Sequence, residues 1–490
     1  MTFFTLPLNL RLEIVNLLDP ASIFHFALTC RNHFELCRNI VQESALLASQ
    51  WSVINTTCTG SALRRLLTEV LQDPRKGWHV EELRICGYSE EDGSDSISEE
   101  DLDLLRAAAM DLVSLYCYEP KFFLVDNPDE RKNLKETLVD RAVRGSNDAM
   151  VAILLHHLPR IEILRFDTDV GEDTCLDQVM RLIADGYQDT TIAPQLPLQH
   201  LKTTAMSYSD TEGCHEIDWA CYFLCIPSLR TFAAWAMGSE DVITNCEDRL
   251  RTVSAPVSNA GELFFQRCQF DTRSLDTILP LVKNLKRFTY ESGGATVVYS
   301  CYEPRKVIRA LAKYAGHSLE ELMLVGQEED YTVRHSRHYE LVGVLTASYQ
   351  EDEDDISVVS LRDFRKLRSI NCELRCLIPS PDADSDVDEA LSDGFLIQDS
   401  EGCPVSDPRN RLPDDLQELY LHGVFEHDEW EQLRRIFENS NAATPKLMLD
   451  NICIRNPWKP GYENGVPARI GAAEEPPDIF SRSLAKLLGP

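Results

Sequence analysis

The chain lacks the features by which membrane and secreted proteins are recognised. No stretch approaches the roughly 18 apolar residues that a membrane-spanning helix needs. The start has no basic segment of the kind that opens a signal peptide, and Pro7, Arg11 and Glu13 interrupt its apolar run. These absences predict a soluble intracellular protein that is cytoplasmic, nuclear or both.

The chain is also poor in positive charge. It has 48 Lys and Arg against 80 Asp and Glu, which gives a formal net charge of −32, and no Lys/Arg cluster stands out. Nucleic acids and anionic membranes need a basic surface, so we expect neither as a partner. The acidic excess favours solubility or, alternatively, attraction to basic partner proteins.

Motifs for metals and catalysis are absent as well. The sequence contains no C-x₂-C pair, no G-x-S-x-G elbow, no P-loop and no G-x-G-x-x-G turn. The alternating acids of Asp382–Asp393 have Val387 where a calcium loop needs glycine, and they end in aspartate instead of glutamate. We therefore expect no metal, no cofactor and no catalytic residue.

The sixteen cysteines are scattered, and we expect reduced thiols. The densest Cys/His cluster is Cys214-His215 with Cys221 and Cys225. On a helix, Cys221 and Cys225 share one face, so the pattern favours packing in a core over a metal site.

The first fifty residues carry a distinctive helical pattern. Pro7 suits the start of a helix, and Asp19-Pro20 suits the cap and first position of the next one. Two or three short helices are predicted, with apolar residues at helical spacing at Leu10, Ile14, Leu17, Leu18, Ile23, Phe26 and Ala27. So short a unit has too little core of its own and needs the rest of the chain, a partner, or both.

Residues 4–51 resemble an F-box, the motif that docks on the adaptor Skp1 in Skp1–cullin–F-box (SCF) ubiquitin ligases. The resemblance rests on Leu6-Pro7, the leucine stripe and the run Ala27–Arg31, while Asn9 departs from the acidic residue often found there. It implies that Skp1 binds Leu6, Pro7, Leu10, Ile14, Leu17, Leu18, Leu28 and Cys30. The alternative is an ordinary helical cap in which these side chains pack within the chain.

Past residue 60 a six-residue pattern recurs, in which the first, fourth and sixth residues are apolar. The last two alternate as a half-buried strand requires, and helical stretches such as Asp148–Leu158, Ser274–Lys283 and Arg305–Ala315 precede several copies. The copies begin at Val80, Ile161, Leu229, Ala260, Leu285, Leu319, Leu367 and Leu416. Leu201 begins a poor copy with Thr204 at its fourth position, and a last strand is predicted at Leu447 and Leu449.

This body resembles a leucine-rich-repeat horseshoe, an α/β solenoid of parallel strands. The best copy is Ala260–Phe270, in which Cys268 takes the position that bonds backbone in the turn. From Ala260 the starts advance by 25, 34, 48 and 49 residues, against a usual period of about 20–29, so long insertions are implied. The alternative is a non-repeating α/β domain.

An F-box followed by irregular repeats resembles the F-box/leucine-rich-repeat proteins abundant in fungi. The resemblance implies a non-catalytic substrate receptor that reaches cullin through Skp1, with an unknown protein as substrate. Outward residues of the strands are expected to bind that substrate: Arg165, Trp235, Phe264, Arg287, Met323 and Tyr420. The alternative function is a non-ligase repeat scaffold.

Four segments are expected along the chain. Residues 1–51 form the F-box, and 52–160 a helical linker and first repeat with an acidic insertion. Residues 161–454 form the irregular repeats with further acidic insertions, and 455–490 a Pro-rich tail. The acid-rich stretches Ser89–Asp103, Glu351–Asp355 and Asp382–Asp393 are expected to be solvated loops.

Overall fold

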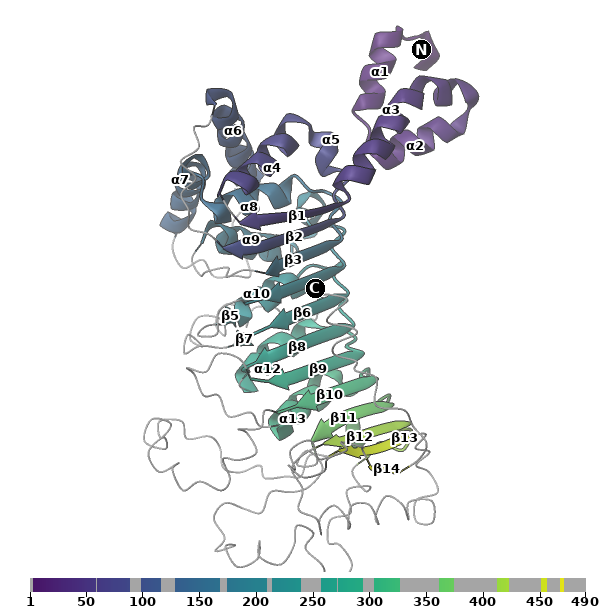
Figure 1. Cartoon of the computed structure of the whole chain (residues 1–490), viewed down its shortest axis with the longest axis vertical. Helices are drawn as coiled ribbons and strands as arrows, with labels where there is room; N and C mark the ends of the chain where they lie inside the picture. Colours follow the sequence, from purple (N-terminus) through teal and green to yellow (C-terminus); the bar gives the residue numbers. More distant parts are fainter. Residues whose placement is uncertain are drawn as a thin grey trace, which may run out of the picture. The chain divides into compact units, whose positions relative to one another are not determined.

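A computed structural model describes most of the first half of the chain and shorter stretches of the second (Figure 1). The described residues are 3–58, 60–88, 98–115, 128–167, 174–208, 214–238, 257–270, 272–293, 304–326, 361–373, 412–422, 451–455 and 468–470. The chain divides into two compact units, one built mainly from Met1–Ser209 and the other mainly from Ser254–Pro490. The fold is mixed α/β with mostly parallel strands, which confirms the predicted class.

Three helices follow a short 3₁₀ turn (Phe3–Thr5) at the start of the first unit: α1 (Leu8–Asn16), α2 (Pro20–Thr29) and α3 (Arg31–Trp51). The predicted caps are present. Pro7 precedes α1, and the Asp19 carboxylate accepts the Ser22 backbone N–H at 2.9 Å with Pro20 at the first helical position. At 21 residues, α3 is longer than the short helices that the sequence predicted. We call α1–α3 the N-terminal helical region.

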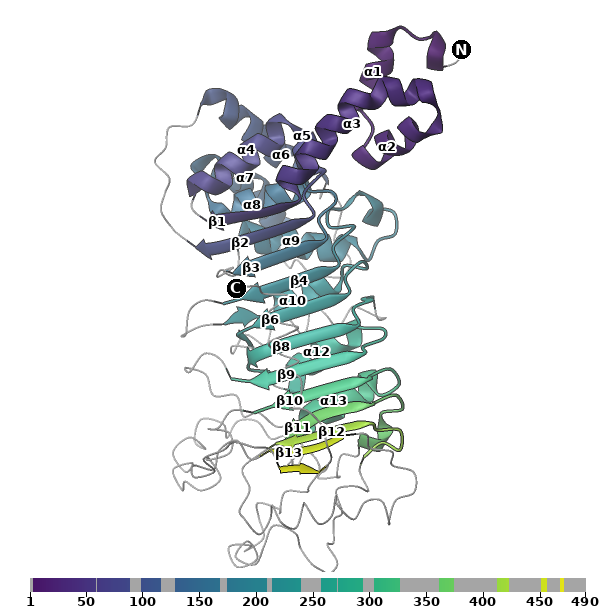
Figure 2. The same cartoon turned by 45° about the vertical axis from the view of Figure 1, so that its right-hand side comes forward.

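The first unit also holds four parallel strands in the order β1-β2-β3-β4 (Figure 2). They are β1 (Val53–Cys58), β2 (Glu82–Tyr88), β3 (Ile163–Asp167) and β4 (Thr203–Ser207). Its other helices are α4 (Gly60–Gln72), α5 (Pro74–Gly77), α6 (Glu99–Leu115), α7 (Pro128–Arg144), α8 (Asn147–His156), α9 (Cys175–Gly186) and the 3₁₀ turn Ala193–Gln195. The leucine spacing predicted β2, β3 and β4 but missed β1, whose Asn-Thr-Thr centre breaks the apolar pattern.

The second unit contains a run of parallel strands that begins at β6 and ends in one antiparallel strand, β14. In register, Phe232, Leu263, Phe288, Leu322, Ile370 and Leu419 lie side by side, and all are buried. The strands are β6 (Thr231–Trp235), β8 (Glu262–Cys268), β9 (Arg287–Ser292), β10 (Glu321–Val325), β11 (Ser369–Glu373), β12 (Glu418–His422), β13 (Asn451–Arg455) and β14 (Ala468–Ile470).

The described part of the chain after β8 contains two helices and two short 3₁₀ turns. They are α12 (Thr272–Ile278), α13 (Pro304–Ala315) and the 3₁₀ turns Leu279–Leu281 and Leu361–Asp363. In sequence, β5 (His215–Glu216), α10 (Ile217–Leu224) and β7 (Met237–Gly238) fall between β4 and β8. The predicted strand at Leu447 and Leu449 lies outside the described residues, and β13 begins just after it, at Asn451.

One acidic segment differs from its prediction. Ser89–Asp103 was expected to be a loop, but Glu99–Asp103 forms the start of α6. The Ser98 hydroxyl caps that helix by accepting the Asp101 backbone N–H at 3.1 Å. Acidic residues in a first turn interact favourably with the helix dipole, so the charges stabilise the helix instead of opposing it. The other two acidic stretches lie outside the described residues, as does the Pro-rich tail apart from Arg455 and the short strand β14.

Two cysteine predictions can be followed in the structure. Cys221 and Cys225 are both fully buried, in keeping with core packing. The sulfur of Cys268 accepts the Met237 backbone N–H at 3.4 Å and lies 3.3 Å from the Gln266 carbonyl oxygen. This is the backbone contact expected for the turn cysteine.

Candidate functional site

The N-terminal helical region buries only one side of its two short helices. Its core consists of Val15, Ile23, Ala27 and Cys37, so each of α1, α2 and α3 contributes one face. Phe26 adds an edge-to-face contact with Phe3 at 5.3 Å between ring centroids. Leu18 also packs against this core, whereas the remaining large apolar side chains of α1 and α2 are mostly exposed.

Those remaining residues are exposed to an unusual degree. On α1 and at its end, Leu10, Ile14 and Leu17 are exposed, and Leu17 retains 85% of its accessible surface. On α2, Phe24 and Leu28 stand one turn apart, with Leu28 at 64%. Several large apolar side chains exposed within so short a segment make this surface a candidate interaction site. We call these five residues the exposed apolar set.

Most of the residues expected to bind Skp1 belong to this exposed side. Pro7, Leu10, Ile14, Leu17, Leu28 and Cys30 are exposed, whereas Leu6 and Leu18 are half-buried. Leu18 packs against the Val15 core, as the alternative of packing within the chain requires. The site prediction omitted Phe24, although its spacing of four from Leu28 could have revealed it.

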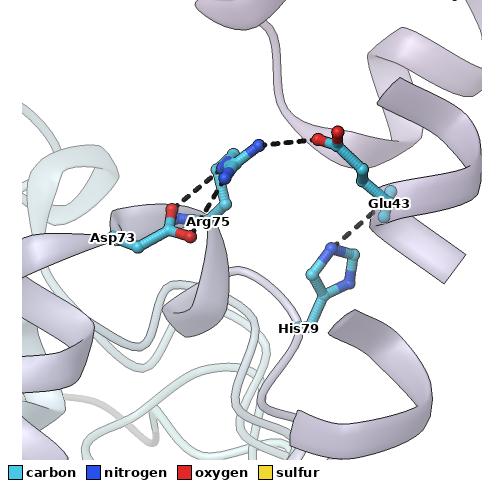
Figure 3. Close-up of polar contacts among 5 residues, drawn as sticks. Glu43, Asp73, Arg75 and His79 are labelled. Carbon is cyan, nitrogen blue, oxygen red and sulfur yellow. Dashed lines mark hydrogen bonds and ion pairs between the residues drawn. The ribbon is translucent and has the colours of Figure 1, made fainter. Parts of the chain in front are cut away.

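Behind this surface, α3 runs to the first strand and contacts α5 (Figure 3). The Arg75 guanidinium lies 3.2 Å from the Glu43 carboxylate and 2.9 Å from that of Asp73, and His79 Nε2 lies 3.2 Å from the Ser44 hydroxyl. The hydrogen bond from Arg75 lowers the pKa of Asp73, and burial lowers the pKa of His79, with the Arg160 charge adding to it. His79 is therefore favoured in its neutral form.

The residues expected to bind substrate divide into two groups. Arg165, Phe264 and Tyr420 are only 5%, 2% and 7% exposed, so the prediction of exposed anchors was wrong for them. Neighbouring strands lie only about 4.8 Å apart, so the adjacent strands limit the exposure of a side chain between them. Phe264 lies between Ala233 and Thr289. Trp235, Arg287 and Met323 are half-buried and remain partly accessible.

Arg287 is the best-defined polar feature of the second unit. Its Nε and Nη2 donate to the Glu321 carboxylate at 2.6 and 3.0 Å, and its Nη1 donates to Glu262 at 3.0 Å. These three residues are direct register partners on β8, β9 and β10. Beside them is a hollow of about 330 Å³, lined by Glu320, Glu321, Arg368, Ser369, Gln417 and Glu418.

The rest of the described chain offers little for chemistry. In the described ranges, no three His, Cys, Asp or Glu side chains come together as metal ligands. Burial raises the pKa of Cys175 to about 12 and also raises the pKa of Cys268, so both thiols are favoured in their protonated form at neutral pH. None of the described helices is both long and apolar enough to cross a bilayer.

Comparison with known proteins adds no relative: no family model matches the chain, and no curated protein matches it. The functional argument therefore rests on the geometry of the chain itself.

Proposed function

We propose that the chain is the substrate-recognition subunit of an SCF-type ubiquitin ligase and has no active site of its own. In this proposal the N-terminal helical region is an F-box that binds a Skp1-like adaptor and, through it, cullin. The parallel strands form an irregular leucine-rich-repeat solenoid that binds the substrate. The observation that carries the proposal is the exposed apolar set on α1 and α2, within the segment that resembles an F-box.

Burial of the exposed apolar set could supply a useful part of the free energy of partner binding. Burying one exposed Leu, Ile or Phe side chain is worth roughly 1.5–3 kcal/mol before the costs of association are subtracted. Covering Leu10, Ile14, Leu17 and Leu28 together would give several kcal/mol. The core of Val15, Ile23 and Ala27 does not include these four side chains, so within the N-terminal helical region they stay exposed to water.

The strands supply support for the repeat part of the proposal. Each strand of the second unit places its leucine-type position in register with the next one, and the Cys268 sulfur makes the turn contact that a repeat of this kind uses. On the opposite face, Trp235, Arg287 and Met323 and the hollow beside Glu321 are the accessible features for a substrate.

The mechanism would be proximity. An adaptor that holds a substrate near a ubiquitin-loaded conjugating enzyme raises the effective concentration of the acceptor lysine without contributing a catalytic side chain. The chain's task is then to bind at both ends and to keep the distance between them suitable.

The test is co-purification of the full-length chain with recombinant Skp1 and cullin. Leu17→Glu should abolish Skp1 capture, because a charge would replace the most exposed leucine of the surface. Met110→Glu is the matched control, since Met110 is an exposed apolar residue on α6, outside the N-terminal helical region. Skp1 capture without cullin would favour the scaffold function, and no Skp1 capture by the wild type would rule the proposal out.

A further inference from the structure

Helix α3 belongs to two environments along its length. Its first half packs in the N-terminal core, where Cys37 is buried and Leu36, Ile40 and Val41 pack around it. Its second half carries Glu43, Ser44 and Trp51 to the start of the sheet. The helix contains no glycine or proline between Arg31 and Trp51, so it has none of the usual causes of a kink or hinge. Whatever holds its second half therefore sets the direction of its first half.

The second half is held by the segment around α5, which we call the α5 clamp and define as Asp73, Arg75, Lys76, Gly77 and His79. Arg75 bridges the two sides, because it bonds Asp73 through Nε and Nη2 at 2.9 and 3.1 Å and Glu43 through Nη1 at 3.2 Å (Figure 3). Asp73 also accepts the Arg75 backbone N–H, which fixes the start of α5. The arginine is thereby oriented toward α3.

The clamp grips α3 at two further points. One is His79, a buried side chain whose Nε2 lies 3.2 Å from the Ser44 hydroxyl, one residue along α3 from Glu43. The other is Lys76, whose ammonium stands 4.7 Å from the centroid of the Trp51 ring and is bonded by Glu69 at 3.0 Å. These contacts lie about two helical turns apart, so rotation of α3 about any single contact is opposed by the others.

The clamp is itself seated on the body of the unit by Gly77. A Cβ at this position would stand 2.2 Å from the carbonyl oxygen of His157, which follows α8 directly. Real Cβ atoms do not approach backbone oxygen so closely, so only glycine permits this seating. The contacts thus run without interruption from α8, through α5, to α3.

We propose that the α5 clamp fixes the direction of the N-terminal helical region relative to β1–β4, with Arg75 and Gly77 as its positioning residues. The exposed ion pair of Arg75 and Glu43 contributes little stability; its role is to select one orientation, which the buried contacts then hold. The functional consequence rests on the proposed ligase function. A fixed direction decides which lysines of a bound substrate face the conjugating enzyme.

The direction can be measured on the full-length chain with two bioorthogonal spin labels, at Ala21 on α2 and at His200 beyond α9, both exposed. The wild type should give one narrow distance distribution. Gly77→Ala should shift or broaden it, because the clamp can no longer seat on the His157 carbonyl. Glu43→Arg should broaden it as well, since the new charge repels Arg75.

The matched control is Glu35→Arg, which makes the same charge change on α3 at a residue that pairs with Arg38. It should leave the distribution unchanged. Unchanged distributions in both Gly77→Ala and Glu43→Arg would overturn the proposal. If Gly77→Ala fails to fold, the Glu43→Arg and Glu35→Arg pair still decides, because both residues are exposed.

A second readout separates this proposal from the proposed function. Clamp variants should bind Skp1 within about twofold of wild type, while in a reconstituted ligase the set of modified lysines on the chain itself should widen. If the wild type binds no Skp1, the ligase function fails, and the spin-label distances still test the clamp. If Skp1 binds and the lysine pattern is unchanged in variants with broadened distances, the clamp has no role in transfer.

Discussion

Leucines meet opposite fates in the N-terminal helical region and in the parallel strands. Leu17 and Leu28 are mostly exposed, whereas Leu263, Leu322 and Leu419 on the strands are buried. The difference lies in the neighbours. A strand leucine is flanked by its register partners on both sides and covered by the rest of its unit. Among the described residues, α1 and α2 are covered on one side by α3 and Phe3. Identical side chains should therefore stabilise the fold in one region and serve binding in the other.

The largest expected effect lies in the strands. Phe288→Ala removes a fully buried ring between Leu263 and Leu322 and should lower the free energy of unfolding by about 3–5 kcal/mol. Urea unfolding followed by circular dichroism measures it. A loss under 1 kcal/mol would show that the row of strand positions is not a packed core.

Acid should weaken the body of the first unit through His156. Burial, with the charge of His157 adding to it, lowers the pKa of His156 to about 4, so the neutral ring is favoured in the folded state. In the unfolded chain the ring takes up a proton near pH 6.5, so stability should fall as the pH drops from about 6.5 to 4, by on the order of 3 kcal/mol. His156→Gln should flatten that dependence. An unchanged pH profile in the variant would assign the acid sensitivity to other groups.

The N-terminal surface should show the reverse balance between stability and binding. Leu17→Ala should change the free energy of unfolding by less than about 0.5 kcal/mol, because the side chain is exposed. It should weaken Skp1 binding about tenfold or more, which corresponds to about 1.4 kcal/mol. Parallel melts and calorimetric titrations separate the two quantities. A large loss of stability would mean that Leu17 packs within the chain.

The smallest effect concerns the cap of α2. Asp19→Ala removes the acceptor of the Ser22 backbone N–H and should cost about 1 kcal/mol in the N-terminal helical region alone. Hydrogen exchange should be faster in α2 of the variant than in wild type, and its rate in β8 and β9 should be unchanged. The Ser22 hydrogen bonds also lower the pKa of Asp19, so this contribution should persist at neutral pH and be lost as the pH falls below about 4. Exchange that rises equally in both regions would contradict the separation drawn between them.

Local patterns in the sequence predicted much of the fold. Leucine spacing located β2–β4, β6 and β8–β12, because a strand with one buried face needs apolar residues at fixed positions. It missed β1, since polar Asn55, Thr56 and Thr57 interrupt the apolar pattern and the segment joins the sheet by pairing with β2. β14 was missed for a related reason: three residues carry no period, and only their partner β13 makes them a strand.

The candidate site was predictable to a smaller extent. Helical spacing identified Leu10, Ile14 and Leu17, but it could not separate them from Leu18, which turns toward the core. Alternation along a strand predicted which face of the sheet carries Arg165 and Phe264. The exposed fraction of these side chains depends on residues of the neighbouring strands, which alternation does not reveal. The α5 clamp left no sequence pattern, because it depends on bringing Glu43 and Arg75, 32 positions apart, within 3.2 Å.

The most direct test of the central claim is the affinity of the full-length chain for Skp1, measured by isothermal titration calorimetry. The wild type and Met110→Glu should bind alike, and Leu17→Glu should show no measurable binding while its thermal melt matches the wild type. Equal affinities for Leu17→Glu and Met110→Glu, or no binding by the wild type, would contradict the assignment of the exposed leucines to a partner surface.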